Sequence, residues 1–232
     1  PLDWADYYSK NFNGNWREYF LLGSEDGLSG GIDGHKGSGA IVFGLKDIVK
    51  SNYLEIIKQY EYIIYTRFDQ FYTDYHPDIK GEQLWIPSGE DYFGVCDRHA
   101  VFPSIYAEDY LNICNYIDSK HSQDHLPEKL NCESVYLKHL EESGLSKKIK
   151  RIKRFQFTAS ESSDSTRWRI AEYKVYFYND LWMKYPQEFL DSIKNNIEDN
   201  NFLRVLKSNP RLLINYLYLC ARRRISKIFK FN

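Results

Sequence analysis

The sequence lacks several features that would assign the protein to a class at once. It has only four cysteines, and none of them has the C-x-x-C spacing of a zinc or redox site: Cys96, Cys114, Cys132 and Cys220. We therefore expect reduced thiols in a cytoplasmic protein, not a disulfide framework. Lysine and arginine number 31 against 32 acidic residues, a net charge of −1. This balance excludes a nucleic-acid-binding protein that works through its overall charge.

Long apolar segments and nucleotide-loop motifs are also missing. The chain has no signal peptide and no run of about 18 apolar residues, the length that a membrane-spanning helix needs. It begins at Pro1 without a methionine, which leaves open whether the natural N-terminus is truncated. Residues 23–39 hold seven glycines but neither a G-x-G-x-x-G nor a Walker pattern. This stretch must be a loop, either a flexible linker or one whose amides and Lys36 approach an anionic ligand.

Aromatic residues are unusually abundant. They make up 17% of the chain, with 20 tyrosines. Coding bias together with core packing would explain this number, and so would a cleft lined with aromatic rings for carbohydrate. The composition alone leaves both explanations open.

Apolar periodicity predicts an α/β domain over residues 1–200. Residues 61–66 are apolar on both faces, which is typical of a central strand, and residues 83–87 are the next expected strand. Residues 147–160 are basic and alternating, which favours a strand facing solvent or anions on one side. Helices are expected over residues 40–60, 106–119, 131–144 (with Gly144 as C-cap) and 185–199 (with Pro186 in the first turn).

The C-terminal tail, residues 201–232, has a different charge pattern. After Asp199 no acidic residue occurs, whereas eight lysines and arginines follow up to Lys230. We expect a basic amphipathic helix. It could lie on an anionic membrane surface, which would make the protein peripheral on the inner face of a membrane, or dock on the domain with its charges in water.

Charged side chains follow both expected strands. In an open α/β sheet, ligands bind beyond the carboxyl ends of the strands, and here "TRFDQFYTD" and "SGEDYFGVCDRHAVF" stand at those ends. Taking the two strands as neighbours, we expect these side chains in one region. Carboxylates suit a hard divalent cation, arginine pairs with phosphate, and a further carboxylate can accept a proton. The candidates are Arg67, Asp69, Asp74, Glu90, Asp91, Asp97, Arg98 and His99.

Each candidate also has an ordinary structural explanation, and no single residue is specific. The alternatives are a turn cap for Asp69, turn positions for Glu90 and Asp91, a local salt bridge between Asp97 and Arg98, and a partly buried imidazole for His99.

Five segments follow one another over about residues 36–170: "KGSGAIVFGLKDIV", "YEYIIYTRFDQFY", "LWIPSGEDYFGVCDRHAVF", "CESVYLKHL" and "STRWR". Their order resembles a family of GT-A-type glycosyltransferases found in surface-polysaccharide gene clusters and in large algal viruses. The resemblance implies a GT-A-like mixed sheet flanked by helices. It also implies transfer of a sugar from a nucleotide-diphosphate donor to a hydroxyl of a surface glycan or polysaccharide acceptor.

The resemblance also implies roles for individual residues. The R-x-D stands where other GT-A enzymes carry D-x-D, so Asp69 falls at the position of a Mn²⁺ or Mg²⁺ ligand and Arg67 replaces the first acid. Asp97 is the first choice for the general base that activates the acceptor, which implies inversion, and Asp91 is the second. The donor would be held by Arg67, Asp69, Arg98, His99 and Lys36, and the acceptor by Glu90, Tyr92, Arg167 and Trp168.

The sequence departs from that family at its start. GT-A enzymes usually open with a β-strand that holds the nucleotide base, and no clear strand of this kind precedes residue 36. Either the start is truncated or its signal is disguised. The missing strand favours an alternative, a non-catalytic carbohydrate-binding or scaffold protein with a degenerate GT-A fold, whereas the charges at the strand ends oppose it. A metal-dependent nuclease or phosphatase fits the acidic cluster but not the aromatic richness.

Overall fold

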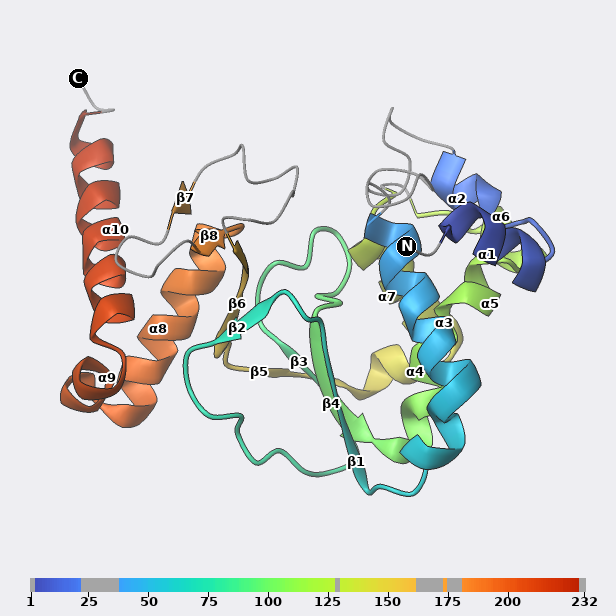
Figure 1. The fold of residues 1–232 in the computed structure, drawn as a ribbon, viewed down its shortest axis with the longest axis horizontal. Coiled ribbons are helices and arrows are strands. Elements are labelled where there is room, and N and C mark those ends of the chain that lie inside the picture. Colours follow the sequence, from blue (N-terminus) through green and yellow to red (C-terminus); the bar gives the residue numbers. More distant parts are fainter. Residues whose placement is uncertain (1–2, 22–37, 128–129, 162–172, 175–180, 230–232) are drawn as a thin grey trace. The chain divides into compact units, whose positions relative to one another are not determined.

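The computed structural model describes residues 3–21, 38–127, 130–161, 173–174 and 181–229. Over these residues the chain is a mixed α/β protein with a mixed sheet flanked by helices (Figure 1). It divides into two compact units. Unit 1 comprises residues 1–65, 79–86 and 90–151, and unit 2 comprises residues 66–78, 87–89 and 152–232. The units thus do not separate at the expected boundary near residue 200, because the C-terminal helices belong to unit 2.

The sheet of unit 1 has the order β1-β4-β3-β5, with β1 at Tyr62–Thr66, β3 at Leu84–Pro87, β4 at His99–Pro103 and β5 at Ile149–Ile152. Strands β3 and β4 are antiparallel. The Ser104 amide after β4 donates to the Glu61 carbonyl before β1 (3.1 Å), so these two strands are also antiparallel. The Ser88 amide after β3 donates to the carbonyl of Ile152 at the end of β5 (3.0 Å), which makes this pair parallel and the sheet mixed.

The expected position of residues 61–66 in the sheet is wrong. Strand β1 stands at the end of the described strand order, and Ile64 is 53% exposed. Ile63 and Tyr65 pack against the core, so the apolar residues on the second face do not indicate a buried strand. The assumption that the two strands preceding the charged segments are neighbours is wrong as well, because β4 lies between β1 and β3.

The helices of unit 1 largely follow the predicted segments. Helices are confirmed over residues 40–60 and 131–144, but the expected helix over 106–119 is interrupted at Asn112, whose amide bonds three residues back to Asp109 (3.3 Å). Residues 3–21 contain helices and no strand. The elements are α1 (Trp4–Asn11), α2 (Arg17–Leu21), α3 (Ser38–Ile57), η2 (Ser104–Tyr106), α4 (Ala107–Leu111), α5 (Ile113–Ile117), α6 (Lys120–Asp124), α7 (Cys132–Glu142) and η3 (Leu145–Lys148).

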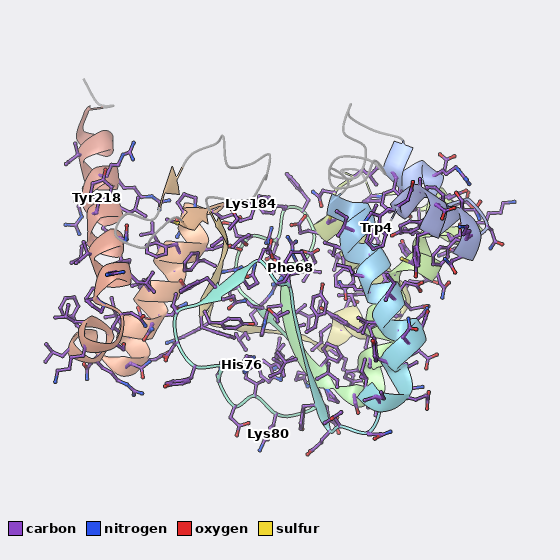
Figure 2. All side chains as sticks on the ribbon, viewed as in Figure 1. Trp4, Phe68, His76, Lys80, Lys184 and Tyr218 are labelled. Atoms are coloured by element: carbon purple, nitrogen blue, oxygen red, sulfur yellow. The ribbon has the colours of Figure 1, made fainter. Side chains whose placement is uncertain are left out.

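An aromatic cluster joins the first helices to α3. Trp4, labelled in Figure 2, is 7% exposed and lies against Gly44 of α3. A Cβ atom at position 44 would stand 2.1 Å from a carbon of the Trp4 ring. Glycine lowers helix stability by about 1 kcal/mol relative to alanine, and the close approach of the indole explains why it stands inside α3.

Helix α7 has clear sequence boundaries. The Asn131 side chain accepts from the Ser134 amide (2.8 Å) and forms a capping box. Gly144, the predicted terminator, has φ +75°, a left-handed conformation that glycine adopts readily. Between them, His139 is 3% exposed, and its Nε2 lies 2.7 Å from the Asp109 carbonyl, to which it donates. Burial lowers the pKa of His139 to about 4, and the charges of Lys46 and Lys50 also lower it.

We expect His139 to make the protein less stable in mild acid. Its folded pKa of about 4 lies below the unfolded value of 6.5, so the unfolded chain binds more protons between these pH values. The contribution is complete above pH 6.5 and falls by about 1.4 kcal/mol per pH unit on acidification, a total of about 3 kcal/mol. His139→Gln should remove this dependence in denaturant unfolding measured from pH 7 to pH 4. The exposed His125→Gln is the control, and identical pH profiles for the two variants would contradict the prediction.

Unit 2 contains an antiparallel sheet with helices packed on it. Its order is β2-β6-β8-β7, with β2 at Gln70–Tyr72, β6 at Gln156–Glu161, β7 at Tyr173–Lys174 and β8 at Leu181–Met183. Helix α8 (Pro186–Asn200) packs on β6 (Figure 1). Its Phe189 and Ile193 recur at helical spacing and join Phe157 in the core. The predicted Pro186 stands in the first turn, and α9 (Phe202–Ser208) and α10 (Pro210–Phe229) follow.

The basic stretch at residues 147–160 is not the single strand that was predicted. It divides into η3, β5 and β6, and the two strands belong to different sheets. Arg154, between the strands, is 1% exposed and lies 2.9 Å from Glu188 of α8. The alternation of basic residues therefore does not predict the environment of Arg154, which is inside an ion pair, whereas Lys150, Arg151 and Lys153 are exposed as expected.

Candidate functional site

The segment after β3 carries the most strained backbone in the part of the chain that the structure describes. Three residues other than glycine have positive φ values within four positions: Glu90 (+55°), Tyr92 (+39°) and Phe93 (+71°). Such conformations are uncommon for bulky side chains and cost of order 1–3 kcal/mol each, and they cluster at functional sites. We call residues 90–94 the strained loop. It belongs to unit 1.

Backbone contacts hold the strained loop against the start of α7. A Cβ atom at Gly94 would lie 1.9 Å from the Glu133 carbonyl oxygen, so only glycine fits there. The next amide, of Val95, donates to that same oxygen (3.2 Å). On the other side, the Asn131 side-chain amide donates to the Tyr92 carbonyl (2.8 Å). Several contacts thus hold the backbone of the loop in place, and a strained conformation persists only when its surroundings hold it in this way.

A buried ion pair supports the same loop. Arg98 is 2% exposed, and its Nη2 lies 2.9 Å from Glu133 Oε1. Its Nη1 donates to the Glu90 carbonyl (3.3 Å), and the guanidinium carbon stands 5.8 Å from the centre of the Tyr92 ring. Arg98, predicted to bind the donor, is thus enclosed beneath the loop, and these contacts position the loop.

Asp91 connects the loop to β5. Its Oδ1 accepts from the Cys96 amide (2.9 Å) and from Arg151 Nη1 (3.0 Å). The Asp91 side chain is 35% exposed. The carboxylate is therefore oriented by two donors while part of it still reaches solvent, an arrangement suited to a residue that accepts a proton from a bound hydroxyl.

Two aromatic rings face outward from the loop. Tyr92 is 41% exposed and Phe93 is 71% exposed. Large apolar side chains are rarely held outward on strained backbone for packing alone, and exposed aromatic residues are enriched at binding surfaces. Together with the half-buried Glu90 and Asp91, the loop presents rings and carboxylates side by side.

Asp97 and His99 lie inside the core instead. Both are 0% exposed. Burial raises the pKa values of Tyr110 and Tyr136, and the Asp97 charge raises them further, so Asp97 lies near both rings. Lys46 Nζ, 1% exposed, stands 3.5 Å from the centre of the Tyr136 ring. An ammonium over an aromatic face is stabilised electrostatically, so Asp97 belongs to a buried cluster that contains a cation.

The R-x-D motif lies in unit 2, and its arginine and aspartate form an ion pair with each other. Arg67 Nε and Nη2 stand 3.1 and 2.6 Å from the two Asp69 oxygens, and Gln70 Nε2 approaches Asp69 Oδ1 at 3.4 Å. Phe68, between them, is 89% exposed (Figure 2). Both carboxylate oxygens of Asp69 thus already have a cationic partner.

These residues do not fit a resident divalent cation. Such an ion takes several oxygen ligands, whereas Asp69 is a single carboxylate already occupied by a guanidinium. Among the described residues, no three His, Cys, Asp or Glu side chains are arranged to hold a metal ion. The predicted role of Asp69 as a metal ligand therefore has no support from the side chains around it.

The structure groups only some of the predicted residues. It joins Glu90, Asp91, Tyr92 and Arg98 at the strained loop, and Arg67 to Asp69 in unit 2. Lys36, Arg167 and Trp168 lie outside the described residues.

Two residues of unit 1 were missed. Lys46 lies on the face of α3 that also carries the buried Ala40 and Phe43, and this helical spacing could have revealed it. No sequence pattern could have indicated the role of Glu133, because its partner Arg98 stands 35 residues earlier in the chain.

The chain matches no protein-family model, no curated protein and no solved structure. Among the described residues, no helix is both long enough and apolar enough to cross a membrane.

Proposed function

We propose that the protein is a glycosyltransferase that moves a sugar from a nucleotide-diphosphate donor to a hydroxyl of a glycan acceptor. The observation that carries the proposal is the strained loop, which holds Tyr92 and Phe93 outward next to Glu90 and Asp91. Sugar rings have apolar C–H faces that stack on aromatic side chains, and hydroxyls that carboxylates bind and deprotonate. The motifs "GEDYFGVCDRHAVF" and "TRFD" favour the same function.

Asp91 is the better placed of the two candidate bases. Its side chain reaches solvent and is oriented by the Cys96 amide and Arg151. Asp97 has no exposed surface and would need a rearrangement of the core to meet an acceptor. Removal of the hydroxyl proton by Asp91, with direct attack on the anomeric carbon, gives inversion.

Arg67, in unit 2, stays the predicted group for binding the phosphates of the donor. The planar guanidinium binds phosphate oxygens in the same two-pronged way that it binds a carboxylate. In the structure the Asp69 carboxylate is bound to the Arg67 guanidinium. A donor phosphate would therefore displace Asp69 from Arg67.

The proposal predicts donor binding that does not require a divalent cation. A panel of UDP-, GDP-, ADP- and dTDP-sugars would be titrated calorimetrically against the full chain, in Mn²⁺ and in EDTA, together with an assay for nucleotide release. We expect one donor to bind in both conditions, with affinities within about tenfold, because Arg67 supplies the charge. Binding only with Mn²⁺ would contradict the role of Arg67 and restore that of Asp69 as a ligand.

The absence of any donor binding would favour the second candidate, a carbohydrate-binding or scaffold protein. One observation supports this alternative. Arg67 and Asp69 of the R-x-D motif are paired with each other, as in an ion pair that only stabilises the fold.

A further inference from the structure

Unit 2 contains a cavity at the end of α8 that the proposed transfer reaction does not use. Its volume is about 340 Å³, within the range of about 300–1,000 Å³ that is usual for small-molecule sites. The lining combines three asparagines and two tyrosines with a serine, a threonine, Asp74 and Arg204. Every lining side chain can therefore form hydrogen bonds, and no aliphatic side chain is among them.

The side chains of this cavity are ordered by one another. The Asn200 side-chain amide donates to Asp74 Oδ2 and to Asn196 Oδ1, the latter at 3.1 Å. Asn196 is 6% exposed, and its own amide donates to the Thr73 carbonyl. Carboxylate and amide oxygens each accept more than one hydrogen bond, so these groups keep acceptor capacity for a ligand while their positions are fixed.

The backbone between two of the lining residues, Asn200 and Arg204, is strained. Asn201, between α8 and α9, has φ 60° and ψ 158°, a region that is essentially confined to glycine. Its side chain accepts from the Arg204 amide (3.1 Å) and begins α9. This turn sets the spacing between Asn200 and Arg204, and strain of this kind marks functional sites.

The charges and side-chain types of the lining residues indicate which class of ligand the cavity would bind. One carboxylate and one guanidinium balance each other, which disfavours phosphates and other highly charged molecules. A single carboxylate is too few for a divalent cation. Tyr75, which lines the cavity and is 86% exposed, supplies an aromatic ring. Fixed amide and carboxylate groups beside an aromatic ring match hydroxyls arranged around an apolar face.

We infer that this cavity binds a neutral sugar unit of a glycan. The inference does not depend on the transfer reaction, because the lining residues belong to unit 2 and none of them has a role in the proposed chemistry. The site would hold a sugar of an oligosaccharide whether or not the protein transfers another.

The test uses the full chain on an array of immobilised neutral and uronic-acid-bearing oligosaccharides. The saccharide with the strongest signal is then titrated calorimetrically. We expect a neutral saccharide to bind, and Tyr75→Ala and Asn200→Ala each to weaken it by about tenfold or more, since each removes a direct contact. Tyr60→Ala, an exposed tyrosine of unit 1 (62% exposed), is the control and should bind as the unchanged protein does.

Several outcomes would overturn the inference. They are the absence of any saccharide signal, binding restricted to uronic-acid saccharides, and a Tyr75→Ala affinity equal to that of Tyr60→Ala. Because Tyr75 is exposed, its replacement should not disturb folding. If Asn200→Ala fails to fold, Tyr75→Ala alone still tests the site. Binding must also persist in Asp91→Asn, which separates failure of this site from failure of the proposed transfer.

Discussion

Arg154→Met is expected to lower the free energy of unfolding of unit 2 by about 3–5 kcal/mol, the usual effect of removing one partner of a buried ion pair. Arg154 Nη1 lies 2.9 Å from Glu188 Oε1, and the two side chains are 1% and 0% exposed. The guanidinium also donates to the carbonyls of Ser88 (3.0 Å) and Gly89 (2.8 Å). Methionine has a similar length but supplies neither charge nor donors, so the buried Glu188 would lose its cationic partner.

Urea unfolding would measure this effect, and two further variants would identify its cause. Lys153→Met alters the neighbouring basic side chain, which is exposed and pairs with Asp199 (2.7 Å), and should unfold close to the unchanged protein. Arg154→Met combined with Glu188→Gln should recover part of the loss, because glutamine is neutral and can still accept from the Thr158 amide, which bonds Glu188 at 2.7 Å. If the double variant were less stable than Arg154→Met, the buried charge would not be the cause.

Asp91→Asn is expected to lower kcat for sugar transfer by about 10²–10⁴-fold, the range for loss of a general base. The asparagine oxygen can still accept from the Cys96 amide and from Arg151, which bond Asp91 Oδ1 at 2.9 and 3.0 Å. The loop should therefore keep its shape and the donor its affinity. Steady-state kinetics with the donor identified in the nucleotide-sugar panel would show a fall in kcat with little change in the donor KM.

Asp97→Asn provides the comparison for the two candidate bases. Since Asp97 is enclosed near Tyr110, Tyr136 and Lys46, this change should lower stability. It should lower kcat much less than Asp91→Asn does in protein that remains folded. The opposite ranking, with transfer abolished by Asp97→Asn and retained by Asp91→Asn, would return the role of base to Asp97.

The local signals in the sequence predicted the helices well. Residues 40–60 and 131–144 and the segment that begins at Pro186 have apolar periodicity or terminal residues that act within a few positions of the chain. Gly144 shows the same point, since its left-handed conformation depends only on its own lack of a side chain. The single helix over 106–119 failed because one residue, Asn112, interrupts an otherwise apolar pattern.

The candidate site stays a prediction, and the structure shows the environment of its residues. The segment "GEDYFGVCDRH", singled out from the sequence, divides into two groups with different environments. Glu90, Asp91 and Tyr92 reach the surface, whereas Asp97 and His99 are buried. The strain at residues 90–93 has no sequence signal, because Glu90, Tyr92 and Phe93 are not residues that favour positive φ.

The sequence by itself determined the α/β class, the main helices and the segment that carries the candidate loop, because these depend on periodicity and on residues close together in the chain. Only the tertiary structure decided which charges are accessible. Nothing in the sequence distinguishes Arg98 and Arg154 from surface arginines. Each is nevertheless buried and paired with a glutamate, 35 residues away for Arg98 and 34 for Arg154. The physical reason is that burial and pairing depend on contacts between distant segments, and a linear pattern contains no information on which segments meet.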